Sequence, residues 1–223
     1  MPPIWWPSTG LRPATALRGS DRVAGQIALQ CRCGTVRYSV EAPRRGSGTR
    51  LKCYCRDCQT AAHALGRADF LDRAGGSDLW QTTPDLLAIE AGQNELQVLR
   101  LSPNGLFRWH ASCCGSPVCN TLPRLSLGFV GVGLDPERRQ DWDRMLGPVY
   151  THANTTGAKR GGGAPAKDVR FGAAGVQMIR RMAMYALVGQ SSKSPLRDAR
   201  GQPIAPVRVL SLEERRAAQA ALS

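Results

Sequence analysis

The chain has 223 residues and a formal net charge of +13, and hydrophobic residues make up 42% of it. This length is enough for one domain, or one domain with an appendage. The 24 glycines and 15 prolines exclude a simple helical bundle and favour a loop-rich, mainly β architecture. No segment approaches the roughly 18 to 20 consecutive apolar residues of a membrane span, so an integral membrane protein is excluded.

Residues 1–25 begin MPPIWWPSTG and are rich in Pro, Gly, Ser and Thr. They lack the charged region ahead of a long apolar stretch that a secretory signal needs. We therefore expect a disordered leader, a first domain over residues 26–135, and a cytoplasmic protein.

Residues 26–135 predict short strands separated by cysteine-bearing turns. The segment 27–40, IALQCRCGTVRYSV, predicts two strands, because Val36, Tyr38 and Val40 alternate as on a half-buried strand. Beyond it we expect a polar loop, a second cysteine turn, a short helical segment, two strands paired through a turn at residues 92–94, and a strand that leads to a third cysteine turn. The loop covers residues 41–49, the second cysteine turn 51–58 and the helical segment 59–65. The paired strands cover residues 85–91 and 96–101, and the last strand covers residues 106–111.

Residues 136–223 read as a basic, partly helical C-terminal extension. Most of the net charge lies here, since residues 138–223 hold 15 Lys or Arg against 6 Asp or Glu, whereas residues 26–137 hold 12 against 10. A basic tail of this kind is more often a solvated surface than a nucleic-acid site. We expect a short helix over residues 141–146 and a mobile Gly-rich loop over residues 155–167.

Two further helices are predicted in this extension. Residues 173–188 form an amphipathic pattern, and Ser211 with Glu214 forms a capping box that starts a last helix ending near Leu222. We expect the apolar stripe of the first of these helices to pack as core. That stripe consists of Val176, Ile179, Met182, Met184 and Leu187.

The eight cysteines indicate metal binding. Those in the patterns Cys-x-Cys-Gly and Cys-x-Cys-x-x-Cys are too close in sequence to bridge each other readily, but they converge well on one tetrahedral ion, and a glycine lets the backbone turn beneath it. Zinc is the expected metal, with an iron–sulfur cluster as the alternative. The cysteines are Cys31, Cys33, Cys53, Cys55, Cys58, Cys113, Cys114 and Cys119.

In these motifs the chain resembles the glutathione-dependent formaldehyde-activating enzyme family, which has the β-tent zinc fold. The motifs CRCG, CYCRDC and CCGSP stand in the family's order within residues 27–123. The resemblance implies a β-tent domain of small antiparallel sheets in a divergent bacterial branch. It also implies one or two zinc ions, with glutathione as a candidate co-substrate. The structural ion would be held by Cys31, Cys33 and Cys114, and the catalytic one by Cys53, Cys55 and Cys58.

The third motif departs from the family. Ala111 stands where the family has a cysteine, and an additional cysteine, Cys113, precedes Cys114. Either Cys113 replaces the missing ligand after a shift in the turn, or water or His110 completes the set. We favour Cys113.

A few other residues are candidates for binding. A guanidinium pairs well with a carboxylate, so Arg56, Arg67 and Arg108 could hold a glutathione-like ligand, although an isolated arginine is more often merely solvated. His63 could act as a base, although a packed histidine is the more common case. Cys119 matches no ligand position and is expected to be an ordinary buried cysteine.

Two functions remain open from the residues. A site of three cysteines leaves one position for an incoming thiolate, which suits a carbon–sulfur lyase acting on a small thiol or a thiol–aldehyde adduct. The alternative is a non-catalytic zinc domain whose basic tail binds nucleic acid or a protein partner. The pattern leaves open which of the two applies, and neither function calls for a membrane.

Overall fold

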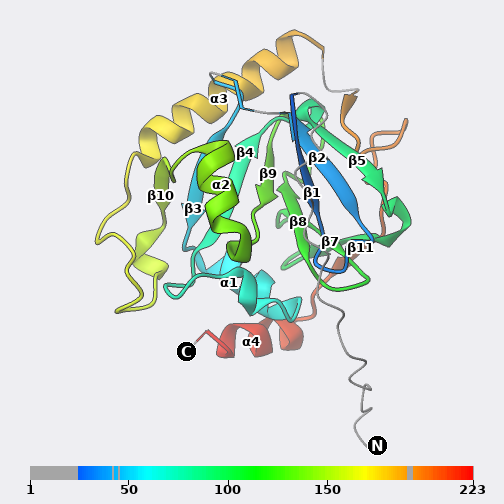
Figure 1. Cartoon of the computed structure of the whole chain (residues 1–223). Coiled ribbons are helices and arrows are strands. Elements are labelled where there is room, and N and C mark those ends of the chain that lie inside the picture. Colours follow the sequence, from blue (N-terminus) through cyan, green and yellow to red (C-terminus); the bar gives the residue numbers. More distant parts are fainter. Residues whose placement is uncertain (1–24, 42, 45, 190–192, 223) are drawn as a thin grey trace, which may run out of the picture.

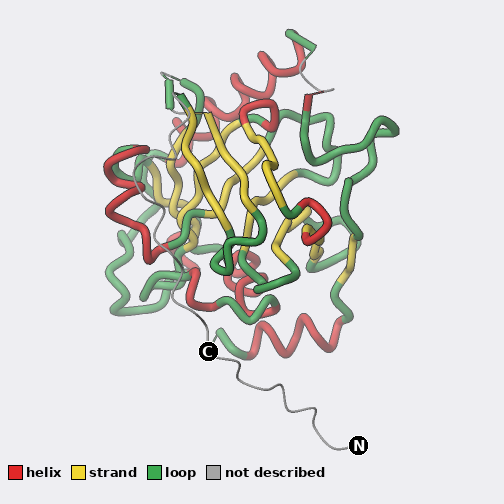
Figure 2. The backbone as a smooth tube through the Cα atoms, turned by 45° about the vertical axis from the view of Figure 1, so that its right-hand side comes forward, coloured by secondary structure: helices red, strands yellow, loops and turns green. Residues whose placement is uncertain are grey.

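The computed structural model describes residues 25–41, 43–44, 46–189 and 193–222. Apart from Gly25, the predicted leader lies outside the described residues. The described part of the chain contains two β-sheets and four α-helices, three of which follow residue 138. The mainly β class predicted from the sequence is therefore confirmed, together with a C-terminal region that carries helices. Figure 2 shows the strands in the middle of the molecule with the helices around them.

The two sheets differ in size. The smaller has the order β1-β2-β5, with β1 at Gln26–Gln30, β2 at Arg37–Glu41 and β5 at Leu87–Ala91. The larger has the order β10-β3-β4-β9-β8-β7-β6-β11. Its strands in that order are Thr151–Ala153, Thr49–Cys53, Ser77–Thr82, Val130–Gly133, Pro117–Thr121, Phe107–Ala111, Leu96–Arg100 and Val207–Val209.

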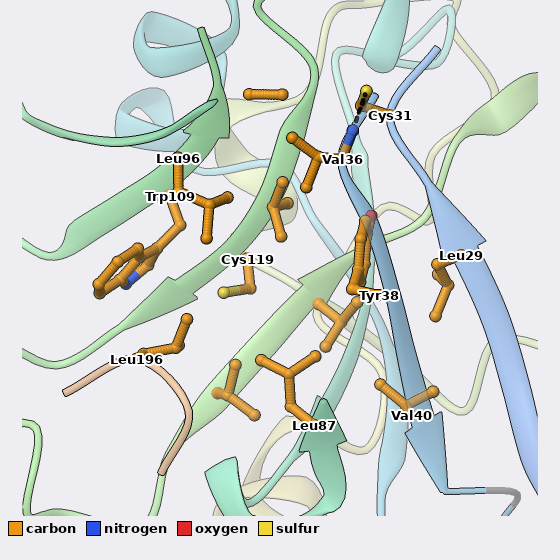
Figure 3. Packing of buried hydrophobic residues seen from close by; sticks show 14 of the residues in the cluster. Leu29, Cys31, Val36, Tyr38, Val40, Leu87, Leu96, Trp109, Cys119 and Leu196 are labelled. Atoms are coloured by element: carbon orange, nitrogen blue, oxygen red, sulfur yellow. Dashed lines mark hydrogen bonds between the residues drawn. The ribbon is translucent and has the colours of Figure 1, made fainter. Parts of the chain in front are cut away.

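The main hydrophobic core lies between the two sheets. Leu29, Tyr38 and Val40 of the small sheet and Trp109 and Cys119 of the large sheet belong to one buried cluster (Figure 3). Trp142 and Leu196, from the C-terminal region, are buried in the same cluster. The three apolar side chains of residues 36–40 are buried as predicted, but Ser39 between Tyr38 and Val40 is buried too, so the alternation holds only in part.

The C-terminal region also supplies both outer strands of the large sheet. β10 pairs parallel with β3, and β11 pairs parallel with β6, whereas all other pairings in this sheet are antiparallel. Parallel strands need a long connection, and both outer strands come from far along the chain. Segments beyond residue 136 thus complete the sheet that carries the cysteine turns.

The expected pairing of residues 85–91 with 96–101 is wrong. β5 pairs with β2, in a register that sets Leu87 opposite Val40, and β6 pairs with β7. Between them Gly92 adopts a left-handed conformation (φ 71°), and a Cβ at this position would lie 2.5 Å from the carbonyl oxygen of Thr35. This turn moves the chain from the small sheet to the large one, so the two strands end in different sheets.

The helices lie at different sides of the sheets (Figure 1). Leu99 and Leu101 form a second buried cluster with Ala61 of α1 and Leu210, which precedes α4. α3 lies at the end of the molecule away from α1 and α4. The capping box predicted at Ser211 and Glu214 is confirmed. The helices are α1 at Arg56–Ala64, α2 at Arg139–Leu146, α3 at Phe171–Leu187 and α4 at Leu212–Ala220. Among the described residues, no helix has the length and apolar character to cross a membrane.

The prediction that the apolar stripe of residues 173–188 packs as core is wrong. Within α3 only Ala174 and Tyr185 are buried. The helix is attached by polar side chains: Gln177 and Arg181 both bond the Thr49 hydroxyl at 3.0 Å. Because this polar face is turned toward the sheet, the apolar stripe faces outward, except for the half-buried Met182.

Candidate metal centres

Four cysteines from two distant turns meet beside the small sheet. Cys31 and Cys33 follow β1, and Cys113 and Cys114 follow β7. Their sulfurs all lie within 4.8 Å of one another, with separations of 3.4 Å for Cys31–Cys33, 3.2 Å for Cys33–Cys113 and 4.0 Å for Cys113–Cys114. Thiolates bound about 2.3 Å from a tetrahedral ion lie about 3.8 Å apart. The four sulfurs therefore match the size and donor set of a closed tetrahedral site.

The local backbone explains how two adjacent cysteines can join one group. β7 ends at the buried Ala111, and the amide of Gly115 donates to the Ala111 carbonyl at 2.7 Å, so the chain turns at once. Gly115 is left-handed (φ 70°), a conformation that costs glycine little. His110 is not part of the group; its ring Nδ1 lies 3.4 Å from the carbonyl oxygen of Arg108, and burial lowers its pKa.

The four thiols differ in acidity. Hydrogen bonding with Cys31, assisted by Ser116, lowers the pKa of the Cys114 thiol to about 3. The same hydrogen bond, together with burial, raises the pKa of Cys31. Burial and the neighbouring Cys33 raise the pKa of Cys113 to about 12. The group thus carries negative charge at neutral pH even without all four thiols ionised, which suits a cation.

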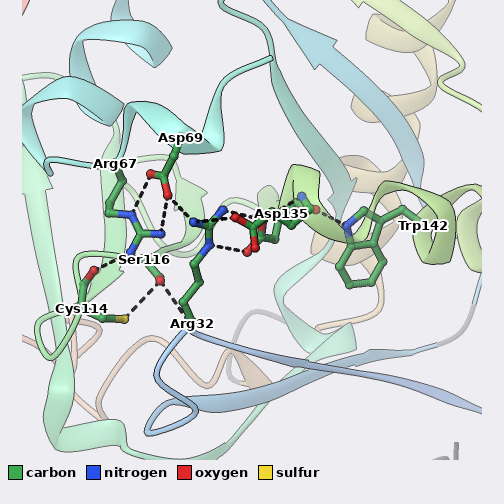
Figure 4. Close-up of polar contacts among 8 residues, drawn as sticks. Arg32, Arg67, Asp69, Cys114, Ser116, Asp135 and Trp142 are labelled. Carbon is green, nitrogen blue, oxygen red and sulfur yellow. Dashed lines mark hydrogen bonds and ion pairs between the residues drawn. The ribbon is translucent and has the colours of Figure 1, made fainter. Parts of the chain in front are cut away.

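An ion-pair network fastens this group to the rest of the fold (Figure 4). Arg32, between the first two cysteines, pairs with Asp69, with Asp135 at 2.8 Å and with Glu137 at 3.1 Å. Arg67 bonds both oxygens of Asp69 at 2.9 Å and donates to the Cys114 carbonyl at 2.9 Å. Arg67 therefore braces the four-cysteine turn and does not lie at the other cysteine group.

This geometry makes a labelling prediction. In zinc-loaded protein, iodoacetamide should leave Cys113 and Cys114 unmodified, and after chelation it should label both, because metal binding masks thiolates that are otherwise reactive. Mass spectrometry of the peptides measures the result. Cys33, which is also exposed, serves as an internal comparison within the group. Labelling of Cys113 in the zinc-loaded protein would show that it is not a ligand.

The second group contains Cys53, Cys55 and Cys58. Cys53 ends β3, Cys55 is the N-cap of α1, and the amide of Cys58 donates to the Cys55 sulfur at 3.4 Å. The three sulfurs lie within 4.8 Å of one another, and no further Cys, His, Asp or Glu of the described residues belongs to this group. Such a set gives three protein ligands and leaves a fourth position open.

These thiols are weakly acidic in the absence of a metal. Hydrogen bonding with Cys53, together with burial, raises the pKa of Cys58 to about 11, although Cys55 and Arg108 act in the opposite direction. A metal needs the deprotonated sulfurs, so binding must release protons, and metal affinity at this group should fall as pH falls.

A loop from the C-terminal region, which includes Asn154 and Gly157, packs against this group. The Gln59 amide donates to the carbonyls of Tyr54 and Gly157 at 2.8 Å each, and Asn154 Nδ2 lies 3.5 Å from the Cys53 sulfur. A Cβ at Gly157 would overlap with the Tyr54 carbonyl oxygen. The Gly-rich segment 155–167 thus packs against the cysteine turn. Sequence reasoning missed Gln59 and Asn154, since no motif marks either residue.

Arg108 is the charged neighbour of the second group. It is only 6% exposed, and its Nη1 lies 3.9 Å from the Cys58 sulfur and 3.4 Å from Asn120 Oδ1. Its Nε is buried and has no hydrogen-bond partner within the described part of the chain. Arg108 and Cys58 both line a cavity of about 50 Å³ between α1 and the large sheet. A buried guanidinium with an unused donor is costly unless an acceptor meets it.

The remaining predicted residues lie elsewhere. Arg56 is exposed at the start of α1, and His63 is half-buried on the same helix, outside both cysteine groups. Cys119 is buried in the main core, where desolvation raises its pKa. Of the three arginines considered for ligand binding, only Arg108 contacts a cysteine of the second group in the contacts described above.

Comparison with known proteins places the chain in a family. No curated protein matches it at a significant level. A crystal structure of a Rhodobacter sphaeroides protein, a Northeast Structural Genomics target, is similar with 19% identity and a TM-score of 0.37, covering 57% of this chain and 100% of that one. A similarity of that size carries no conclusion about function. The model of a family of unknown function, DUF6151, matches residues 23–208. The chain belongs to this family.

Proposed function

We propose that the protein binds two zinc ions with separate tasks. The four-cysteine group would hold a structural ion, because four protein ligands close a zinc site. The three-cysteine group would hold a reactive ion, because it leaves a position for an exogenous thiol. Both groups offer only sulfur, a soft donor set that zinc and iron–sulfur clusters share. Separations near those of a tetrahedral site favour a single zinc ion in the first group.

For the second group we propose the making and breaking of a carbon–sulfur bond between a thiol and a small aldehyde. Zinc held by Cys53, Cys55 and Cys58 would favour the deprotonated form of an incoming thiol at neutral pH. The thiol sulfur then attacks the carbonyl carbon. A carbon–sulfur bond forms, the carbon–oxygen π bond breaks, and the proton released by the thiol ends on the oxygen. Thiol and aldehyde give a hemithioacetal, and nothing else is consumed.

Arg108 is the observation that carries this proposal. Three thiolates and one divalent ion carry a net charge of −1, which the buried guanidinium beside Cys58 balances. Its unpartnered Nε can donate to the carbonyl oxygen as negative charge develops there, and such donors typically contribute 10²- to 10³-fold in rate. The Arg108 side chain would thus balance the charge of the metal site before the reaction and stabilise the carbonyl oxygen during it.

The cavity limits the size of the aldehyde. Its volume of about 50 Å³ is room for a few water-sized groups, since one water needs about 10–15 Å³ of such space. Formaldehyde fits, whereas the body of a thiol such as glutathione must lie outside. Arg56 is exposed at the start of α1, between Cys55 and Cys58, and remains a candidate for binding the carboxylates of glutathione.

The test is an exchange NMR measurement with formaldehyde and glutathione on protein of known zinc content. We expect about two zinc ions per chain and a faster exchange between free and adduct signals than without protein. Arg108→Met should keep the zinc and lose about 100-fold of the rate enhancement. Arg73→Gln, which changes an exposed arginine, is the matched control. Full zinc occupancy with no faster exchange would refute the lyase proposal.

A further inference from the structure

The outward face of α3 is the largest group of exposed apolar side chains on one helix of the described structure. Of the exposed large hydrophobic residues, six lie on α3 or at its C-cap, and each is between 50% and 80% exposed. They are Phe171, Val176, Ile179, Met184, Leu187 and Val188. Val176, Ile179 and Leu187 fall on one stripe at helical spacing. Figure 1 shows α3 along one end of the molecule.

The charge around this face is mostly positive. Residues 159–188 contain six Lys or Arg and one acidic residue, Asp168, and α3 itself contains Arg180 and Arg181 and no Asp or Glu. An apolar helix face flanked by basic side chains is typical of helices that lie in the interface of an anionic membrane.

A second copy of the chain is a poorer occupant. Seventeen residues of helix are about 26 Å long. Since a helix with its side chains is about 10 Å wide, one face offers a few hundred Å². A stable interface needs about 800 Å² from each partner. Pairing two α3 helices would also place like charges opposite each other, which disfavours association.

A groove beside α3 offers a place for a phosphate. It has a volume of about 780 Å³ and is lined by Arg180, Arg181, Met184 and Val188 on the helix side and by Gly48 and Leu86 opposite. Arg181 Nη1 donates to Thr49 at 3.0 Å, which fixes the guanidinium at the groove. Asp85 also lines the groove, so two arginines face one carboxylate there and the groove keeps a net positive charge. Burial lowers the pKa of Arg181, and a phosphate in this groove would add a second anion beside its desolvated charge.

We propose that α3 docks on an anionic lipid bilayer. Val176, Ile179 and Leu187 enter the interface, and Arg180 with Arg181 meets lipid phosphates at the groove. Since Thr49 and Cys53 stand at opposite ends of β3, the three-cysteine group lies about 13 Å along the strand from the docking face. The proposal does not depend on the function of the metal centres.

Co-sedimentation of the full zinc-loaded chain with vesicles tests this inference. We expect binding to vesicles of 30% phosphatidylglycerol in phosphatidylcholine, at least about tenfold weaker binding to phosphatidylcholine alone, and loss of binding in high salt. The triple variant Val176→Ser, Ile179→Ser, Leu187→Ser should bind at least about tenfold more weakly, and Arg180→Gln several-fold more weakly. All four residues are exposed, so circular dichroism melts should stay unchanged.

Matched controls lie on α4, at the other end of the molecule. Leu212→Ser removes an exposed leucine and Arg216→Gln an exposed arginine, and both variants should bind as the unchanged protein does. The proposal fails if the unchanged protein ignores anionic vesicles, or if the α3 and α4 variants bind alike. It also fails if light scattering shows that the unchanged protein is a dimer and the triple variant a monomer, because a second copy would then cover this face.

Discussion

Replacing Cys31 by serine should leave a chain that does not fold cooperatively. Cys31 and Cys113 are 82 residues apart in sequence, and their sulfurs lie 3.9 Å from each other. Structural zinc contributes about 10–16 kcal/mol in small zinc-binding peptides, which is comparable to the whole stability of an ordinary domain, about 5–15 kcal/mol. Loss of one ligand should therefore remove most of the native population. Thermal melts by circular dichroism and zinc analysis measure the outcome.

The matched variant is Cys55→Ser in the second group. Its three cysteines lie within six residues of sequence. The metal there therefore connects parts of one turn and no distant segments of the chain. We expect a folded protein with one zinc ion fewer per chain. A cooperative melt for Cys31→Ser would show that the first group is not needed for folding. Complete unfolding of Cys55→Ser would show instead that the second group is structural.

Replacing Arg50 by methionine should cost about 3–5 kcal/mol of unfolding free energy. Arg50 is 1% exposed; its guanidinium bonds both oxygens of Asp78, at 3.1 and 2.8 Å, and reaches Asp143 and the Gly147 carbonyl at 2.6 Å. Its removal leaves Asp78 buried without its cation, and breaking a buried pair from one side has this cost. Urea denaturation measures the change.

Two comparisons separate the buried pair from a general loss of charge. Arg139 also approaches Asp143, at 3.9 Å, but is 68% exposed, so Arg139→Met should change the free energy by less than about 1 kcal/mol. The double variant Arg50→Met, Asp78→Leu should recover part of the loss, because no charge is then left unpaired. If Arg50→Met costs no more than Arg139→Met, the buried pair does not stabilise the protein.

The sequence predicts the local features well. Cysteine spacing predicted the group of Cys53, Cys55 and Cys58, since residues two or three apart in a turn have few ways to lie far from each other. That Cys31 and Cys33 join the third cysteine turn was expected only from the family resemblance, because these residues lie about 80 positions apart. The last helix was readable from Ser211 and Glu214, whose capping bonds are formed within one turn. The burial of Val36, Tyr38 and Val40 was predictable for the same reason, because it depends only on which face of one strand meets the core, whereas the burial of Ser39 on the other face was not.

The pairing of strands that are distant in sequence could not be predicted in the same way. Leu87 and Leu96 begin strands that look like a hairpin, but the side chains of a strand do not encode which neighbour it takes, and these two strands join different sheets. β11 is exposed at all three residues, so no burial pattern marks it. Arg108 could be proposed as a binding residue from its charge, but its burial beside Cys58 depends on how α1 packs against the large sheet.

The two outer strands of the large sheet have a consequence for protein synthesis. β10 and β11 are only three residues long and are the last strands to leave the ribosome. Until they emerge, β3 and β6 each present an open row of backbone donors and acceptors, which other nascent chains can pair with. Because β11 begins at Val207, the row on β6 stays open until more than 100 further residues have been made. We therefore expect a chain that stops before β10 and β11 to aggregate more readily than one that contains both strands.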